Sequence, residues 1–289
     1  MTRLCGSWTA AAAVTLFLLS ACARTDAIGA PGASGSPEAS GEPAPANQLV
    51  LRVEQTGGFV SPSMLAGRLP QVSVYADGRV ITQGPQIAIY PGPALPNVLV
   101  QQASPDTVEG LVAKGRQLGA VGDLGQPGVA DATTTVLTVG DRTIQAYALN
   151  EAQPNDQALT AAQREARSKL AAFVTQLSDL PTAKGMPEAQ PYQPTAVAAI
   201  SVPYVKVDNP PSPPAPTPWP GPALPGKPLQ EGGSLRCLTV TGDAAGKVLA
   251  AAEKANQNTP WTSGSATWSV SFRPLLPDET GCVDLQSKR

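Results

Sequence analysis

The residue types that carry most enzyme chemistry are scarce in this chain. It has 289 residues, of which none is histidine and four are cysteine. Histidine is the usual general base and the commonest metal ligand, so its absence excludes Ser-His-Asp and Cys-His catalysis and most zinc sites. We therefore expect no metal site and no cofactor in this protein.

Carboxylates are the remaining side chains that could catalyse a hydrolysis. Asp278 and Glu279 are adjacent acids, and two carboxyl groups about 5–9 Å apart can hydrolyse a glycosidic bond without histidine. Serine chemistry has less support, because neither G-x-S-x-G nor S-x-x-K occurs in the sequence. A histidine-independent envelope hydrolase, either a carboxylate-pair glycosidase or a Ser/Lys enzyme, is thus the alternative to a protein without catalytic activity.

A phosphate-binding loop is matched in part by GPALPGKP at residues 221–228. Such a loop holds phosphates with backbone N–H groups and binds Mg²⁺ through a Ser or Thr hydroxyl. Pro222, Pro225 and Pro228 carry no N–H, and Pro228 stands where the hydroxyl belongs. Because the formal charge is −2 without a basic run, we expect the chain to bind neither nucleotides nor nucleic acid.

The amino terminus has the pattern of an exported protein. Arg3 precedes the apolar run WTAAAAVTLFLL at residues 8–19, which is too short to span a bilayer permanently and is typical of a signal peptide. The run ends in Leu19-Ser20-Ala21-Cys22. This sequence resembles the lipobox of bacterial membrane lipoproteins, and the Ala, Gly and Pro content is similar to that of actinobacterial lipoproteins.

The resemblance covers the first 22 residues and concerns export and anchoring. It implies cleavage after residue 21, acylation of Cys22, and attachment to the cell membrane at its extracytoplasmic face, because several acyl chains together make a stable anchor. Residues 23–47 are rich in Gly, Ala, Ser and Pro and bury too little apolar surface to repay the entropy of ordering. We expect residues 22–47 to form a disordered, lipidated tether with a reach of roughly 25–30 Å.

Cys237 and Cys282 are the cysteines that remain in the mature chain after cleavage and lipidation. An even number of cysteines in an oxidising compartment predicts a disulfide. This bond would close a loop of 44 intervening residues, and the chain-entropy model assigns roughly 4 kcal/mol to such a closure. A catalytic or metal-binding pair is disfavoured because the C-x-x-C spacing is missing.

Turn signals and apolar periodicity predict an α+β fold, with a mainly antiparallel sheet of hairpins packed against two or three helices and a disulfide-closed β-α-β tail. An Asp77-Gly78 turn is expected to place Tyr75 opposite Val80 and Val74 opposite Ile81. The expected strands are 49–53, 72–76, 79–82, 133–139, 142–149, 195–207, 234–241 and 266–273, and the expected helices are 105–118, 158–180 and 243–255.

Composition divides the folded part into three segments. We expect an α+β domain at residues 48–207, a proline-rich connector or docking strip at 208–230, and a β-α-β segment at 231–289. The last segment either completes the main sheet or forms a separate domain.

Three tryptophans stand close together in the C-terminal third of a chain that has 4% aromatic residues. Trp219, Trp261 and Trp268 are expected either to pack in a core or to form a surface that contacts a partner. The sequence as a whole predicts an anchored, non-enzymatic binding module whose partner is a protein or another envelope component.

Overall fold

The computed structural model describes residues 45–118, 122–206 and 215–286. The expected signal peptide, Cys22 and most of the expected tether lie outside the described residues. Within the described ranges, no helix combines the length and apolar character needed to cross a membrane.

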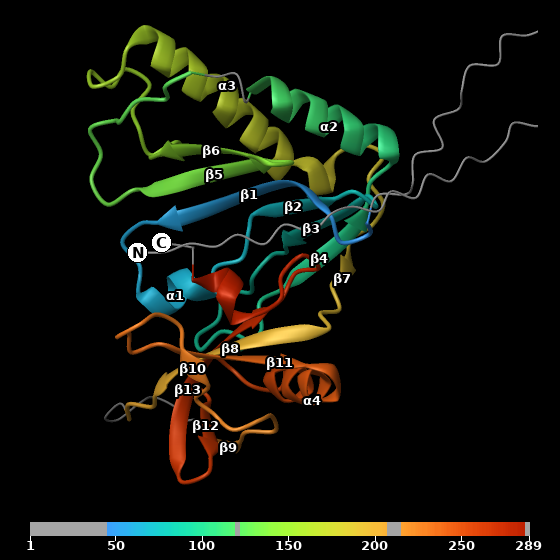
Figure 1. The fold of residues 1–289 in the computed structure, drawn as a ribbon, viewed down its shortest axis with the longest axis vertical. Coiled ribbons are helices and arrows are strands. Elements are labelled where there is room, and N and C mark those ends of the chain that lie inside the picture. The colour runs from blue at the N-terminus through green and yellow to red at the C-terminus, as the bar shows by residue number, and fades with distance from the viewer. Residues whose placement is uncertain (1–44, 119–121, 207–214, 287–289) are drawn as a thin grey trace, which may run out of the picture. The chain divides into compact units, whose positions relative to one another are not determined.

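The fold is α+β, as expected, and it contains two mostly antiparallel sheets instead of one (Figure 1). The first sheet has the strand order β6-β5-β1-β2-β3-β4-β7. Its strands are β1 (Leu49–Gly57), β2 (Val72–Tyr75), β3 (Arg79–Gln83), β4 (Val98–Gln102), β5 (Thr133–Val139), β6 (Arg142–Tyr147) and β7 (Gln190–Pro191). Strands β4 and β7 were not expected from the sequence.

Two helices cover one face of the first sheet, namely α2 (Pro105–Leu118) and α3 (Ala161–Ser178) (Figure 1). Leu51 and Val53 of β1 share one buried cluster with Leu111 of α2 and with Phe173 of α3. Gly115 lets α2 approach closely, because a Cβ at this position would lie 2.9 Å from a methyl group of Val139. The helix-covered face therefore forms the larger core.

The capping residues determine where these helices begin. The Thr160 hydroxyl accepts a hydrogen bond from the backbone N–H of Gln163, and the Thr160 N–H donates to the side-chain oxygen of Gln163, so α3 begins at Ala161 instead of residue 158. Ser104 makes the corresponding bond for α2. Ser61 and Pro62 repeat this Ser-Pro start in α1 (Pro62–Gly67), a short helix that was not expected.

The first hairpin has a different register from the expected one. Val74 lies opposite Val80, because the turn contains three residues and ends at Gly78, whose φ is +90°. A shift of one residue exchanges the faces of a strand, so Tyr75 turns away from the face that buries Val74 and Val80. The second hairpin has the expected two-residue turn, with Val139 opposite Arg142.

The second sheet has the order β10-β11-β8-β13-β12-β9. Its strands are β8 (Ala196–Pro203), β9 (Thr217–Pro218), β10 (Lys227–Pro228), β11 (Arg236–Thr241), β12 (Pro260–Ser263) and β13 (Ala266–Pro274). Strands β11 and β13 both pair antiparallel with β8, one on each side. Helix α4 (Gly242–Glu253) connects β11 to β12 and buries Val248 against Val240 and Trp261.

The expected domain boundary at residue 207 does not separate the two sheets. Strand β8 precedes this residue, yet its hydrogen-bonded partners β11 and β13 follow it. The described part of the proline-rich connector also belongs to the fold, because β9 pairs with β12 and Trp219, Leu224 and Leu229 are buried. Proline composition indicated a connector, but apolar side chains between the prolines anchor this segment.

The chain that follows β13 contacts both sheets. Leu276 packs with Tyr75 and Ile81 of the first sheet. Leu275, together with Leu285 of the 3₁₀ helix Cys282–Leu285, packs in the cluster of the second sheet that includes Ala66 of α1. This C-terminal segment, residues 275–285, positions the polar groups considered next.

Candidate functional site

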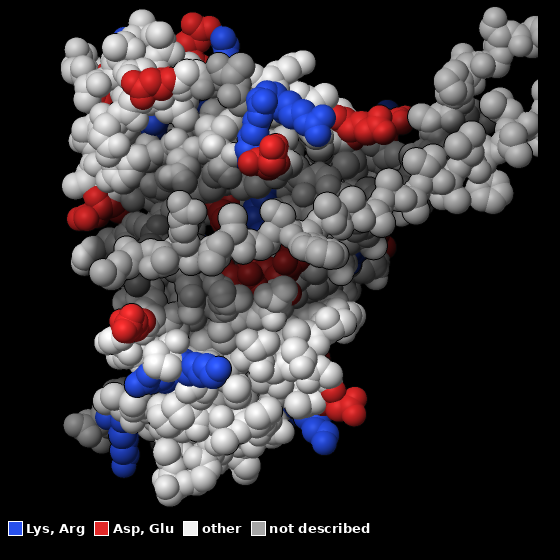
Figure 2. Space-filling view, in the orientation of Figure 1, with Lys and Arg blue, Asp and Glu red and all other residues white. Residues whose placement is uncertain are grey.

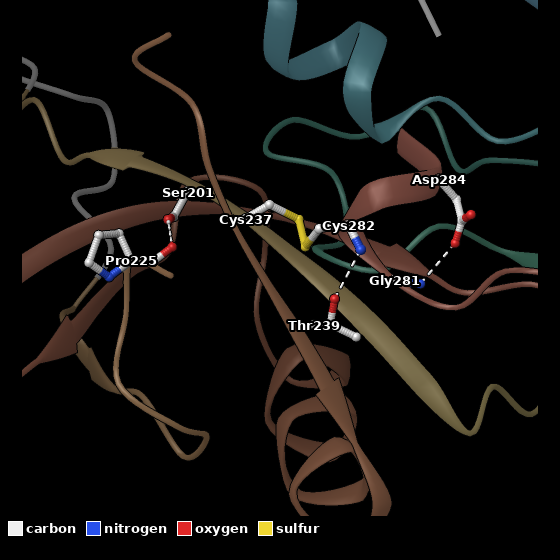
Figure 3. The surroundings of a disulfide bond; sticks show 7 residues. All are labelled: Ser201, Pro225, Cys237, Thr239, Gly281, Cys282 and Asp284. Atoms are coloured by element: carbon white, nitrogen blue, oxygen red, sulfur yellow. Dashed lines mark hydrogen bonds between the residues drawn. A yellow bond between two sulfur atoms is a disulfide. The ribbon is translucent and has the colours of Figure 1, made fainter. Parts of the chain in front are cut away.

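A disulfide joins Cys237 on β11 to Cys282 in the 3₁₀ helix, with the two Cα atoms 5.9 Å apart (Figure 3). This confirms the pairing expected from the sequence. Next to the bond, the N–H of Cys282 donates to Thr239 Oγ1 at 2.9 Å, and a Cβ at Gly281 would collide with the same oxygen. The disulfide and this close approach together hold the C-terminal segment against β11.

Asp278 forms the first of two ion pairs in the C-terminal segment. Its Oδ1 accepts a hydrogen bond from Arg52 Nη2 at 2.7 Å and another from the Tyr75 hydroxyl at 2.6 Å. Arg52 also donates to Ser73 Oγ at 3.0 Å. The carboxylate therefore connects the C-terminal segment to β1 and β2, on the face of the first sheet opposite α2 and α3.

Glu279 forms the second ion pair, which is more deeply buried. Arg273 Nη2 donates to Glu279 Oε1 at 2.7 Å, and the two side chains are 0% and 3% exposed. The other carboxylate oxygen accepts from the N–H of Leu276 at 2.8 Å. Arg273 lies on β13, so Glu279 folds the C-terminal segment back onto its own preceding strand.

Burial and the Asp278 charge shift the titration of the groups around the first pair. Burial raises the pKa of the Tyr75 phenol, and the hydrogen bond to Asp278 raises it further. Burial lowers the pKa of Arg52, but the attraction of Asp278 outweighs it and leaves this pKa above its ordinary value. The arginine therefore stays charged and the tyrosine stays protonated through the neutral range.

The two adjacent carboxylates are therefore committed to different partners. Asp278 binds Arg52, and Glu279 binds Arg273. Such an arrangement joins structural elements and leaves neither acid placed opposite the other across a substrate, as glycoside hydrolysis requires. Within residues 45–118, 122–206 and 215–286, no three His, Cys, Asp or Glu side chains are grouped so that they could hold a metal ion.

Of the two alternatives expected for the tryptophans, Trp219 and Trp261 follow the core and not the partner surface, because they are 9% and 1% exposed. Their rings meet edge to face with centroids 5.7 Å apart, and Trp261 meets Phe272 in the same way at 5.5 Å. Trp268 is half-buried and packs against this cluster. These aromatic rings fill the core beneath α4 because their apolar area is best buried between strands and helix.

Exposed apolar side chains lie elsewhere, in two connecting loops, the first of which runs into the start of α1. Sequence reasoning did not single out either loop. Phe59 and Met64 are 90% and 65% exposed, and Ile87 and Tyr90 are 61% and 82% exposed. Six of the eight large hydrophobic residues that are exposed in the described chain belong to these loops: Phe59, Val60, Met64, Ile87, Ile89 and Tyr90. A sequence signal existed, since apolar residues outside any predicted strand or helix are candidates for contact surfaces.

Strand register places both loops at the same end of the first sheet. Val72 pairs with Val53 and with Thr82, so the end of β1, the start of β2 and the end of β3 lie side by side. The connection from β1 to β2 and the connection from β3 to β4 are therefore at the same end of the sheet. The turn at Gly140 lies at the opposite end. We call the segments 58–64 and 87–90 the apolar loops.

On the face drawn in Figure 2, charged side chains of both signs are scattered, with wide uncharged areas between them.

No protein-family model matches the chain, and no curated protein or solved structure shows a significant match to it.

Proposed function

We propose that this protein is a lipid-anchored lipoprotein of the extracytoplasmic membrane face and that its folded part is a non-enzymatic binding module. The lipobox ending at Cys22 supports the anchor. The Cys237–Cys282 bond supports the location, because disulfides persist in oxidising compartments and are rare in the cytosol. The two arguments are independent, since they rest on different cysteines.

The observation that carries the binding function is the pair of apolar loops at one end of the first sheet. Exposed apolar side chains that gather on one side of a protein are typical of surfaces that contact a partner. Phe59 follows Gly57 and Gly58, both with positive φ, so the backbone turn itself presents the ring to solvent. The partner is a protein or another component of the cell envelope.

The anchor is tested by replacing Cys22 with serine and labelling cells with a palmitate analogue. We expect Cys22→Ser to lose the label and to remain uncleaved, because the sulfur is the acceptor of the lipid. Cys5→Ser is the matched control and should keep the label, since residue 5 precedes the expected cleavage site. Label that persists on the Cys22 variant would refute the anchor.

The binding surface is tested with a photoreactive phenylalanine analogue introduced at Phe59 or Tyr90, both on the apolar loops. Irradiation of intact cells should give the same crosslinked partner from both positions. The control is the analogue at Asp141, an exposed residue in the turn at the opposite end of the sheet. Equal crosslinking from Asp141, or none from either loop, would contradict the proposed surface.

A further inference from the structure

The two sheets of the described chain have four edges, and three of them end in a two-residue strand that contains proline. These strands are β7 (Gln190–Pro191), β9 (Thr217–Pro218) and β10 (Lys227–Pro228). Short edge strands and prolines oppose further pairing, because they leave little ladder and proline has no N–H to donate. The fourth edge is β6, which has six residues and no proline. Strand β6 is therefore an open edge in a fold that protects its other edges.

The register with β5 determines which backbone groups of β6 point outwards. The N–H of Ala148 donates to the carbonyl of Thr133, and the bonds of an antiparallel ladder involve every second residue. Ile144 therefore bonds to β5, whereas the N–H and C=O groups of Thr143 and Gln145 point away from it. Both of these residues are exposed, and no strand of the described chain lies beside them.

The next outward carbonyl of β6, that of Tyr147, is already occupied. Arg167 of α3 donates to it through Nη2 at 2.8 Å. The open stretch thus consists of the outward donors and acceptors of Thr143 and Gln145. Such a row of backbone groups binds another extended backbone, which adds a strand to the sheet.

A second copy of β6 matches this stretch in one register. Antiparallel pairing around a two-fold axis at Ile144 places Thr143 opposite Gln145 of the second copy, and Gln145 opposite its Thr143. The outward groups of both copies then bond to one another, and no occupied group is needed. An axis at Gln145 would instead require the Tyr147 carbonyl, and an axis at Thr143 would set Gln145 against Asp141 in the turn.

The side chains are compatible with the same register. Ile144 is half-buried and would meet Ile144 of the second copy in a pair without backbone bonds, where side chains come closest. Arg142 is the one charged residue of β6, and it would lie opposite Ala146 of the second copy. Like charges are therefore not opposed across the axis.

Pairing of β6 with β6 also closes the assembly. The combined sheet would end on both sides at β7, which contains Pro191, so it offers no open edge to a third copy. We propose that the protein forms a two-fold symmetric dimer in which the β6 strands pair antiparallel around Ile144. This inference goes beyond the proposed function and does not depend on it.

The first test places a cysteine on the axis. In Ile144→Cys the two introduced residues would have Cα atoms about 4.5 Å apart, which a disulfide can bridge. Thr143→Cys is the matched control, because each introduced cysteine would face Gln145 and not the other cysteine. The full chain is treated with a mild oxidant, both in intact cells and after purification, and is then separated by electrophoresis without reductant. We expect a covalent dimer from Ile144→Cys, bonded through residue 144 in a peptide map, and at least about tenfold less from Thr143→Cys.

The second test removes backbone bonds from the proposed interface. The N–H of Gln145 points outwards, so Gln145→Pro should leave the ladder to β5 intact and remove one donor from each copy. Added to Ile144→Cys, this change should lower the yield of covalent dimer by about tenfold or more. Circular dichroism checks that the variant is folded. Thr143→Pro removes the other outward N–H and gives an independent measurement.

The inference is overturned if Ile144→Cys gives no covalent dimer, if Thr143→Cys gives as much, or if the prolines leave the yield unchanged. A disulfide from residue 144 to a different protein would also overturn it, because a foreign strand would then occupy the edge. These results are separable from failure of the proposed function, since the purified chain needs neither lipid on Cys22 nor a partner on the apolar loops. A crosslink from Asp141 within the dimer would contain a second copy of this chain, which mass spectrometry distinguishes from a partner of the loops.

Discussion

Arg273 shows at the scale of single residues how this fold uses charge. A fully buried guanidinium is costly unless a counter-charge and further hydrogen bonds compensate for lost water. Glu279 supplies the charge, and the carbonyl of Pro274 at the end of β13 accepts a further hydrogen bond from Arg273. The two acids that resembled a catalytic pair in the sequence therefore have a structural role. Replacing a buried acid such as Glu279 should reduce the stability of the protein much more than replacing an exposed one.

Replacing Glu279 with glutamine should destabilise the protein by about 3–5 kcal/mol, because it leaves Arg273 buried without a counter-charge. Urea unfolding followed by circular dichroism measures this change. Glu165→Gln is the matched control, since Glu165 pairs with Lys169 on the surface of α3, and it should leave the unfolding midpoint unchanged. Equal effects of the two substitutions would refute the structural role of Glu279.

Tyr192 predicts a loss of stability at alkaline pH. Burial raises its pKa from 10.0 to about 12, so above pH 10 the unfolded phenol loses a proton that the folded one keeps. Stability is therefore fully present below about pH 10 and falls as the pH rises towards 12. Tyr192→Phe should flatten this fall in the free energy of unfolding, while Tyr75, shifted in the same direction, keeps part of it. A pH profile identical to that of the wild type would contradict the assignment.

At the scale of elements, the hairpins and helices follow local chemistry, whereas the C-terminal segment depends on a covalent bond. Residues 275–285 contain only one turn of 3₁₀ helix, so little local structure holds them. Their attachment comes from the disulfide, the two ion pairs and the burial of Leu275, Leu276 and Leu285. This arrangement makes stability sensitive to reduction.

Removing the disulfide should lower the stability by roughly 4 kcal/mol, because the bond closes a long loop in the unfolded chain. The double variant Cys237→Ala/Cys282→Ala and the wild type in reductant should both melt at a lower temperature than the oxidised wild type. A peptide map without reductant identifies the bonded pair. A melting curve that does not respond to reductant would mean that packing alone holds the C-terminal segment.

At the scale of the whole molecule, the two sheets belong to one compact unit. Arg52 of the first sheet and Asp278 of the segment after β13 are joined across more than two hundred residues of sequence. Strand β8 is hydrogen-bonded on both sides by strands that come later in the chain, although neither of them follows it directly in sequence. Because such contacts join residues that are far apart in the sequence, we expect the two sheets to fold together.

Unfolding should therefore be a single cooperative transition. The three tryptophans of the described chain, Trp219, Trp261 and Trp268, all pack with the second sheet, whereas far-ultraviolet circular dichroism reports both sheets. We expect the fluorescence and dichroism curves in urea to have the same midpoint, which is the test of two-state behaviour. Two separate midpoints would show that the first sheet keeps its fold after the second is lost.

Local sequence patterns determined much of the secondary structure. The start of α2 after Ser104 and the two-residue turn at Gly140 are set by neighbours in the chain, so they were predicted correctly. The disulfide was predicted on the expectation that cleavage and lipidation leave two cysteines to pair, and the structure contains this bond. The anchor at Cys22 is also a property of a short sequence and stays a prediction.

Only the tertiary structure decided what the side chains do. A turn longer by one residue moved Tyr75 to the face that meets Asp278, and no local pattern shows which distant strand will pair with β8. The roles of Asp278 and Trp261 depend on what lies beside them in space, because burial and partner atoms determine whether a polar or aromatic group is structural or available to a ligand. Those neighbours come from segments far apart in the sequence, and the fold alone brings them together.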